Sequence, residues 1–253
     1  MRKIAVQNMK GGTAKTTTVV NLAHALALKG HKVLCVDVDA QGNIAASFGV
    51  HHPFTIYDLL IEDQALEDCI TQARDNIDCI LSDQTLAAAE MIMQGQLRRE
   101  ELLGLRLRSL PAYDFVLLDC SPSLNILNQN ALLYANEVLI PVSMDYLAML
   151  GAVHVIDNLD MIRRYFDRII QIVGILPTFY DARTNISREV LEALQETYSG
   201  LMLPPVRIDT RVAQASSRHK TIFEYNPASR AAEDFQALCE VIANEPGQAE
   251  SPA

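Results

Sequence analysis

Residues 10–17 read Lys-Gly-Gly-Thr-Ala-Lys-Thr-Thr, and they stand between a short apolar run at 3–7 and a helical pattern at 15–29. Glycines let a backbone curl closely around a phosphate chain, and the N-terminal end of the following helix adds positive charge. A glycine-rich turn alone is weak evidence, but here the strand, the lysines, the threonine pair and the helix agree. The run therefore predicts a loop that binds the phosphates of ATP, which the protein hydrolyses.

The general pattern of such loops is Gly-x-x-x-x-Gly-Lys-Ser/Thr. Lys15 falls where its amine reaches the β- and γ-phosphates, and Thr16 falls where its hydroxyl reaches Mg²⁺. Ala14 replaces the last glycine of the pattern, and we expect alanine to be tolerated there only if its φ stays negative. The residues predicted to bind the nucleotide in this loop are Lys10, Gly11, Gly12, Thr13, Ala14, Lys15, Thr16 and Thr17.

Lys10 precedes the loop, and four residues separate it from Lys15. From there the side chain cannot easily fold back onto the γ-phosphate of its own loop, but it can reach the phosphates of a facing molecule, as an arginine finger does. An isolated lysine would be read as a solvated surface charge, so this interpretation depends on the loop beside it. It predicts a nucleotide site that two copies of the chain share.

Strand and helix patterns alternate along most of the chain. The apolar runs at 32–38 and 114–119 are typical of strands buried on both faces of a parallel sheet. The alternation predicts an α/β fold, a doubly wound, mostly parallel sheet with helices on both faces. Further strands are expected at 77–81, 137–142, 168–176 and near 206–208, and helices at 15–29, within 55–73, and at 85–93, 98–109, 127–135, 146–165, 188–198 and 227–242.

Domain organisation and compartment follow from composition. No linker divides the chain, so we expect a single P-loop ATPase domain over 1–244 and a disordered tail over 245–253. The five cysteines are scattered without a Cys-x-x-Cys pair, which favours reduced thiols over a metal site. No run approaches the length of a membrane span, and the first apolar run is too short for a signal peptide. These features predict a cytoplasmic protein.

Aspartates end two of the predicted strands, at the edge where doubly wound sheets bind ligands. Asp39 could position the attacking water or a Mg²⁺-bound water, or could cap a short helix that starts near Gln41. Asp37 could support the loop or the metal shell. Asp119 is predicted to bind Mg²⁺ through water, and the turn at 120–123 lies where a γ-phosphate sensor would lie. The predicted catalytic residues are Lys10, Lys15 and Asp39, and the predicted metal-binding residues are Thr16, Asp39 and Asp119.

Several motifs occur together along roughly residues 2 to 243: K-G-G-T-A-K-T-T, V-D-V-D-A-Q-G-N, L-L-D-C-S-P-S-L, V-L-I-P-V, R-I-D-T-R-V-A-Q-A-S-S and F-E-Y-N-P-A-S-R. In this order they resemble the deviant Walker ATPases of the ParA/MinD class, and most closely the small ParA (Soj-like) partitioning ATPases. The resemblance implies ATP and Mg²⁺ as cofactors. It also implies a homodimer that forms on ATP binding and hydrolysis stimulated by a ParB-like centromere-binding or adaptor protein.

The resemblance also implies roles for single residues. Lys10 matches the lysine that crosses the ATP-sandwich dimer, Asp39 the switch-I aspartate and Asp119 the Walker-B residue. Asp209 falls where relatives place an Asn or Asp near the adenine. Asp145 stands where relatives commonly have glutamate.

Members of the resembled family bind DNA without sequence preference, which implies a nucleoid-associated protein. The formal net charge of −10 counts against DNA binding except through a local basic patch. A dimer would double such a patch, and the charge outside it is screened over about 8 Å at physiological salt. The residues expected to contact DNA are Arg183 and Arg211, where relatives have basic contacts, and their neighbours Arg218 and Lys220.

Other functions remain alternatives at this point. A ParA-like positioner of a non-DNA cargo would use the same ATPase with another adaptor. A MinD-like membrane-cycling ATPase needs a C-terminal amphipathic helix with a basic face, whereas 245–253 is acidic and contains proline, so we expect no membrane partner. A dethiobiotin-synthetase-like ligase would not need Lys10, and an iron-sulfur carrier ATPase would want a cysteine pair, whereas Cys120 has no nearby companion.

Overall fold

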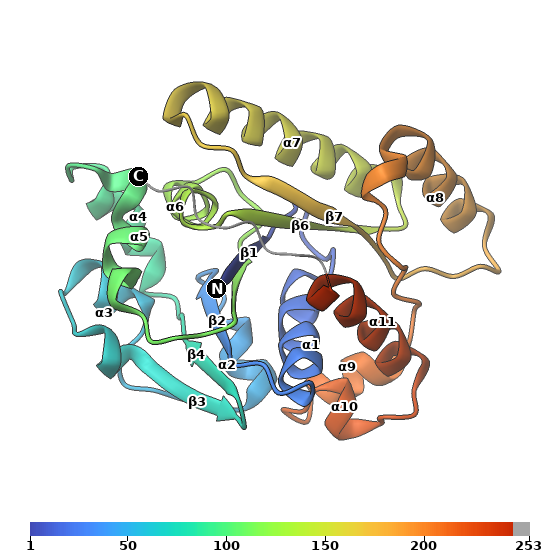
Figure 1. The fold of residues 1–253 in the computed structure, drawn as a ribbon, viewed down its shortest axis with the longest axis horizontal. Helices are drawn as coiled ribbons and strands as arrows, with labels where there is room; N and C mark the ends of the chain where they lie inside the picture. The colour runs from blue at the N-terminus through green and yellow to red at the C-terminus, as the bar shows by residue number, and fades with distance from the viewer. Residues whose placement is uncertain (245–253) are drawn as a thin grey trace.

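A seven-stranded sheet in the order β3-β4-β2-β5-β1-β6-β7 forms the centre of the computed structural model, which describes residues 1–244 (Figure 1). Neighbouring strands are parallel except β3 and β4, which are antiparallel. This confirms the predicted doubly wound, mostly parallel sheet. The strands are β1 Arg2–Val6, β2 Val33–Val38, β3 Ile70–Arg74, β4 Ile77–Ile80, β5 Phe115–Cys120, β6 Glu137–Ser143 and β7 Gln171–Thr178.

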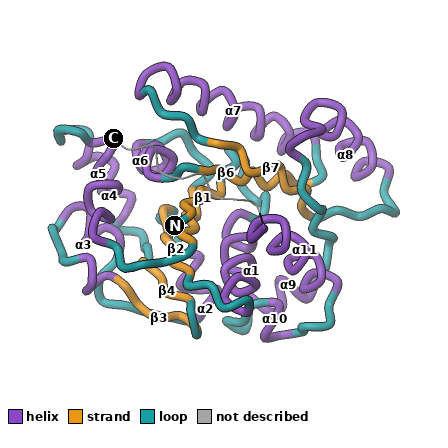
Figure 2. The backbone as a smooth tube through the Cα atoms, in the orientation of Figure 1, coloured by secondary structure: helices purple, strands orange, loops and turns teal. Residues whose placement is uncertain are grey.

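Helices cover both faces of the sheet and connect its strands (Figure 2). Short 3₁₀ turns stand at Leu66–Cys69, Arg99–Glu101, Leu107–Ser109 and Ser199–Leu201. The α-helices are α1 Lys15–Leu28, α2 Asn43–Phe48, α3 Ile56–Ile61, α4 Leu86–Met93, α5 Leu102–Arg106, α6 Ile126–Tyr134, α7 Tyr146–Phe166, α8 Asn185–Tyr198, α9 Thr210–Ser216, α10 Ile222–Tyr225 and α11 Arg230–Asn244.

Each face of the sheet has its own core because successive side chains of a strand point to opposite sides. In β2, Leu34 and Val36 pack into the core under α3 to α8, whereas Val33 and Cys35 pack into the core under α1, α2, α10 and α11. Both cores therefore need apolar side chains along a central strand, up to the aspartates near its carboxyl end. The uninterrupted apolar runs in the sequence therefore mark the strands that lie in the middle of the sheet.

Two expected elements differ from the structure. Residues 70–73 belong to a region expected to be helical, but 70–74 form the edge strand β3, which turns into β4 at Asn76 in the left-handed region (φ 61°). This strand has only one buried residue, so no apolar run announces it. The strand expected near 206–208 is a single bridge between Tyr180 and Arg207, and the short helices α9 and α10 beyond it were not expected.

All five cysteines are buried and unpaired. Within residues 1–244, no helix is both long and apolar enough to cross a membrane. The single domain over 1–244 stays a prediction, and the tail expected at 245–253 lies outside the described residues.

Candidate functional site

A pocket of about 630 Å³ lies where β1, β2 and β5 end, at the predicted edge of the sheet. This volume is typical of small-molecule sites, which measure about 300–1,000 Å³. The phosphate loop and α2 supply most of its wall. The lining residues are Gly11, Gly12, Ala14, Lys15, Thr16, Thr17, Asp39, Gln41, Asn43, Ala46, Ser47, Pro122 and Ser216, so Lys10 and Thr13 of the predicted loop do not line it.

The loop curls through two residues in the left-handed region, Gly12 (φ 76°) and Ala14 (φ 66°). The expectation that Ala14 keeps a negative φ is therefore wrong. Ala14 is the N-cap of α1, and its carbonyl accepts the Thr18 N–H at 2.8 Å, so its conformation is tied to the start of the helix. The alanine Cβ makes this conformation cost roughly 1–2 kcal/mol. The buried Thr178 hydroxyl anchors the loop from β7 by donating to the Thr13 carbonyl at 3.2 Å.

Lys15 is a buried amine at the floor of the pocket. Lys15 is only 8% exposed, and its Nζ donates to the backbone carbonyl of Lys10 at 3.0 Å. Burial lowers the pKa of the Lys15 ammonium, while the nearby Asp119 acts in the opposite direction. A desolvated cation in a pocket gains from an anionic ligand that replaces its lost hydration. Lys15 is therefore placed to hold a phosphate.

Asp119 is the second-last residue of β5 and accepts a hydrogen bond from the Thr16 hydroxyl of the loop at 2.6 Å. Its other carboxylate oxygen, Oδ1, is buried and has no partner among the described residues. Burial raises the pKa of Asp119 to about 7, against the opposing effect of the Thr16 hydrogen bond. A hydroxyl and an under-bonded carboxylate are oxygen donors of the kind Mg²⁺ takes. Thr16, Asp119 and Asp39 would hold the ion, which would offset the phosphate charge.

Asp37 and Asp39 lie two residues apart at the end of β2, and they have different surroundings. Asp37 is fully buried, and its carboxylate accepts the N–H groups of Asp39 and Ile44 at 3.1 and 3.0 Å. Burial and the neighbouring Asp119 hold the pKa of Asp37 well above its usual range. Asp37 thus supports the turn between β2 and α2, and its expected roles at the phosphate loop or the metal shell stay predictions.

Asp39 is half-buried and lines the pocket. Its carboxylate accepts the Gln41 N–H at 3.0 Å. The alternative in which Asp39 caps a helix starting near Gln41 is wrong, because α2 starts at Asn43 and its N-cap is Gly42. The short turn after the strand leaves the Asp39 carboxylate at the pocket wall.

Lys10 lies on the outer side of the loop, where its Nζ pairs with Asp145 at 2.5 Å. Asp145 is the N-cap of α7 and also accepts the Ala148 N–H at 3.0 Å. Burial acts to raise the pKa of Asp145, but the hydrogen bonds from Lys10 and Ser143 outweigh it, so the net shift is downward.

Asn8 positions this segment and was not found from the sequence. Its side-chain oxygen accepts the Lys10 N–H at 2.9 Å, and its amide donates to the Pro141 carbonyl at 2.7 Å. The helix α7 passes so closely that a Cβ on Gly151 would lie 2.2 Å from that oxygen. A glycine inside a 21-residue helix was the available signal for this close approach.

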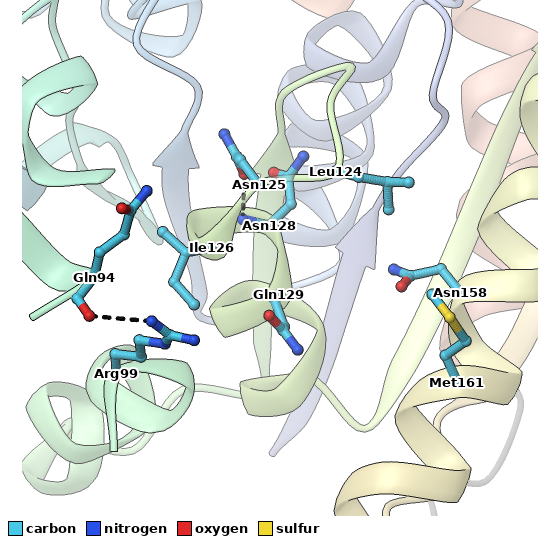
Figure 3. A pocket seen from close by; sticks show the side chains of 9 residues that line it. All are labelled: Gln94, Arg99, Leu124, Asn125, Ile126, Asn128, Gln129, Asn158 and Met161. Atoms are coloured by element: carbon cyan, nitrogen blue, oxygen red, sulfur yellow. Dashed lines mark hydrogen bonds between the residues drawn. The ribbon is translucent and has the colours of Figure 1, made fainter. Parts of the chain in front are cut away.

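Asn128 of α6 fixes the turn after Asp119 and was also missed. Its side-chain amide donates to the carbonyl of Ser121 at 2.7 Å, and its oxygen accepts the Ser121 N–H at 3.1 Å. Figure 3 shows Asn128 in the wall of a second pocket, of about 410 Å³, between α6 and α7. Five amide side chains line this second pocket: Gln94, Asn125, Asn128, Gln129 and Asn158.

The residues expected to contact DNA follow two segments of the chain, one ending near Tyr180 and the other at residues 206–208. Backbone hydrogen bonds between Tyr180 and residues 206 and 208 join the two segments. Arg183 follows the first segment; its side chain is 85% exposed and forms two hydrogen bonds to Asp181, at 2.9 and 2.8 Å. Arg211 follows the second and binds Asp209 at 2.9 Å.

Arg218 and Lys220 lie between α9 and α10. The Arg218 guanidinium stands over the Tyr225 ring at 5.3 Å, and Lys220 is exposed. Among residues 1–244, neither has a carboxylate within ion-pair distance.

Asp209 caps α9, and its side chain is 2% exposed. One carboxylate oxygen accepts the Arg211 backbone N–H at 3.0 Å. The other oxygen is buried without a partner in the described part of the chain. Asp209 is not among the residues that line the 630 Å³ pocket, which reaches α9 only at Ser216.

Comparisons with known proteins agree with this geometry. Residues 1–172 match the AAA domain family. The chain is similar to the sporulation initiation inhibitor protein Soj of Bacillus subtilis, at 35% identity over 95% of this chain and 97% of that protein. It is 33% identical to the chromosome partitioning protein ParA of Myxococcus xanthus, over 94% of this chain and 86% of that protein.

Among solved structures, cobyrinic acid a,c-diamide synthase from Mycobacterium smegmatis with bound ADP and magnesium is similar at a TM-score of 0.83. The identity is 28%, and the match covers 96% of this chain and 94% of that chain. The same enzyme, solved with an ATP analogue and magnesium, superposes equally well.

Proposed function

The chain belongs to the family of ParA/Soj-like P-loop ATPases, and from that premise we propose that it partitions DNA. As a positioning ATPase of this kind it binds ATP with Mg²⁺ and hydrolyses ATP. In the proposed cycle, two copies enclose ATP, and the dimer binds DNA without sequence preference. A ParB-like centromere-binding or adaptor protein then stimulates hydrolysis, which releases the dimer from the nucleoid.

The observation that carries the dimer is the opposite placement of two amines on one loop. Lys15 lies inside the pocket, whereas Lys10 does not line it and keeps a 32% exposed side chain beside Asp145. A part-exposed ion pair is worth about 0–1 kcal/mol, because water competes for both charges. A triphosphate presented by a facing copy carries more negative charge than one carboxylate. We therefore expect Lys10 to exchange Asp145 for the partner's phosphates.

Hydrolysis in this proposal depends on Asp39. Among the described residues it is the carboxylate that lines the pocket, and it accepts a hydrogen bond from the nearby Gln41 N–H. It can therefore orient a water against the γ-phosphate, while Asp37 holds the backbone below it through two N–H bonds. Lys15 stabilises the phosphate charge from within the chain, and Lys10 stabilises it from the opposite copy. We expect slow basal turnover, because one copy alone has an incomplete site.

The proposed DNA surface consists of Arg183, Arg211, Arg218 and Lys220. Arg218 and Lys220 have no carboxylate partner among the described residues, so their charges are available to phosphates. The ion pair of Arg183 is exposed and weak, so it can be exchanged for a DNA phosphate at little cost. The α9 helix connects Asp209 to the loop that carries Arg218 and Lys220. It also contributes Ser216 to the lining of the nucleotide pocket. Nucleotide and DNA surfaces therefore share one element.

Size and DNA retention measured together test the proposal. The protein is run by size-exclusion chromatography with light scattering and assayed for binding to unrelated DNA duplexes, with ATP or ADP, with and without Mg²⁺. The expected result is a dimer that retains DNA only with ATP. A protein that stays monomeric when saturated with ATP while hydrolysis is blocked would contradict the dimer. A dimer that ignores every duplex at low salt would contradict the DNA role.

A further inference from the structure

A third pocket, of about 570 Å³, opens at the edge of the sheet opposite the phosphate loop; we call it the basal pocket. It lies where β1 begins and where α6 and α7 end, and the segment around α5 closes it. Nothing in the ATPase cycle above uses it. Its lining residues are Met1, Lys3, Arg98, Glu101, Gly104, Leu105, Leu107, Arg108, Leu133, Tyr134, Phe166 and Arg168.

Positive charge is concentrated in the basal pocket. Among the described residues, four basic side chains line it, namely Lys3, Arg98, Arg108 and Arg168, and one carboxylate, that of Glu101, so these side chains together carry a charge of +3. The whole chain has a net charge of −10. Such a local excess against the overall field raises the concentration of anions at the pocket mouth.

Interactions with helix C-termini explain the position of only some of these basic side chains. Arg168 donates to the Leu133 carbonyl at 3.3 Å near the end of α6, and the Lys3 ammonium stands over the Tyr134 ring at 4.9 Å. Cations near helix C-termini are favourable in any protein. Arg98 and Arg108 belong to the separate segment around α5, and Arg108 has no carboxylate within ion-pair distance in residues 1–244. Arg98 is paired with Glu101 of its own segment, so of these two arginines Arg108 is the one that lines the pocket without a carboxylate partner among the described residues.

Backbone conformation supports the same reading. Arg98 itself is in the left-handed region (φ 55°), and so is Asp167 (φ 50°), directly before Arg168. Non-glycine residues in this region cost of order 1–3 kcal/mol and gather at ligand-binding sites. Asp167 is the C-cap of α7, where a left-handed residue is common, so Arg98 is the basic residue of the pocket with strained backbone of its own.

The remaining wall is apolar and aromatic. Leu105, Leu107, Leu133 and the ring of Phe166 line it, next to the Tyr134 ring. Guanidinium groups match phosphate oxygens through paired N–H donors, and apolar walls suit a flat ring. We propose that the basal pocket binds a nucleoside di- or triphosphate, separately from the ATP of the phosphate loop. This proposal does not depend on DNA binding or on dimer formation.

Counting bound ADP per chain tests the proposal. Equilibrium dialysis with labelled ADP at low salt should give two equivalents for the wild-type protein and one for Lys15→Ala, which disables the phosphate loop. The double variant Arg108→Glu/Arg168→Glu should also keep one, with the tighter affinity. Combined with Lys15→Ala, it should weaken the remaining ADP binding by about tenfold or more.

The matched control is Arg163→Glu/Arg164→Glu, which reverses two exposed charges on α7 that do not line the basal pocket and should keep both equivalents. A folded Lys15→Ala protein that binds no ADP overturns the proposal, as does weak binding that the basal variants leave unchanged. If Lys15→Ala does not fold, the test is made with Arg108→Glu/Arg168→Glu alone. This variant should lose the weaker of the two bound ADP equivalents and keep the tighter one, and a variant that keeps both overturns the proposal. Pyrophosphate that binds the pocket as tightly as ADP would overturn the proposal that the apolar wall binds the nucleoside base.

Discussion

The Lys10 ammonium and the Asp145 carboxylate form an ion pair between the start of the phosphate loop and the first turn of α7. Asp145 also accepts the Ala148 N–H and the Ser143 hydroxyl, at 3.0 and 2.7 Å, so the carboxylate stays in place when the lysine leaves. The pair therefore has one fixed member and one movable member. This asymmetry suits a lysine that exchanges its own chain's carboxylate for a partner's phosphate.

Asp145→Asn should strengthen ATP-dependent dimerisation. Asparagine is as good an N-cap as aspartate, so α7 keeps its start, while the charge that competes for Lys10 is lost. The pair is part-exposed, so the expected gain is about 0.4–1 kcal/mol, or a two- to fivefold tighter dimer. Analytical ultracentrifugation with ATP measures it. Asp160→Asn, at an exposed position of the same helix, is the control and should change nothing.

Asp39→Ala should bind ATP and dimerise but hydrolyse about a hundredfold more slowly or worse, because it loses the group that orients the water. Phosphate release under single-turnover conditions measures the rate. Turnover within a factor of about two of wild type would remove Asp39 from the catalytic residues.

Asp37→Ala should lower the stability of the protein, since the N–H groups of Asp39 and Ile44 lose their buried acceptor.

Arg218→Glu/Lys220→Glu should weaken DNA binding by at least about tenfold and lower the salt dependence of the binding constant, while ATP-dependent dimerisation is kept. This pair is a cleaner test than Arg211→Glu, which would place a second carboxylate beside the buried Asp209 and disturb α9. Fluorescence anisotropy on labelled duplexes at several salt concentrations gives both quantities. Arg188→Glu, on the neighbouring α8, is the control; equal losses in the control and the double variant would argue against this surface.

Ala14→Gly should stabilise the protein by about 0.5–1 kcal/mol. Glycine removes the Cβ penalty at φ 66°, which exceeds the extra entropy that glycine gains in the unfolded chain. Urea unfolding measures the change. Ala88→Gly in α4 is a matched control with the opposite sign, since an exposed right-handed helical position should lose about 0.5–1 kcal/mol. Destabilisation at both positions would show that the loop gains nothing from the glycine.

Local patterns in the sequence predicted the fold and the central residues of the candidate site, and tertiary contacts determine the rest of that site. Lys15 and Thr16 follow from loop chemistry within a few residues. Asp119 could be predicted because a buried strand runs straight into it, and β-pairing then sets it opposite Asp37. Asn8 and Asn128 act through backbone groups that only the folded chain brings near, so neither belongs to a motif.

Missed elements have equally specific causes. β3 is an edge strand with one buried residue, so its sequence lacks the alternation of a half-buried strand. α10 is a four-residue helix, too short for a periodic signal, although Thr221 and Glu224 form a capping box that could have indicated its start. Arg183 and Arg211 were predicted to contact DNA, but their ion pairs with nearby aspartates depend on rotamers that the sequence does not specify.

The burial of all five native thiols gives the protein a practical property. A maleimide dye will not reach Cys35 or Cys120 in the folded chain, since neither exposes any side-chain surface. One cysteine introduced at an exposed site, such as Arg164→Cys on α7, would then carry the whole label. Donor- and acceptor-labelled copies could report subunit association through energy transfer, with every native thiol left in place.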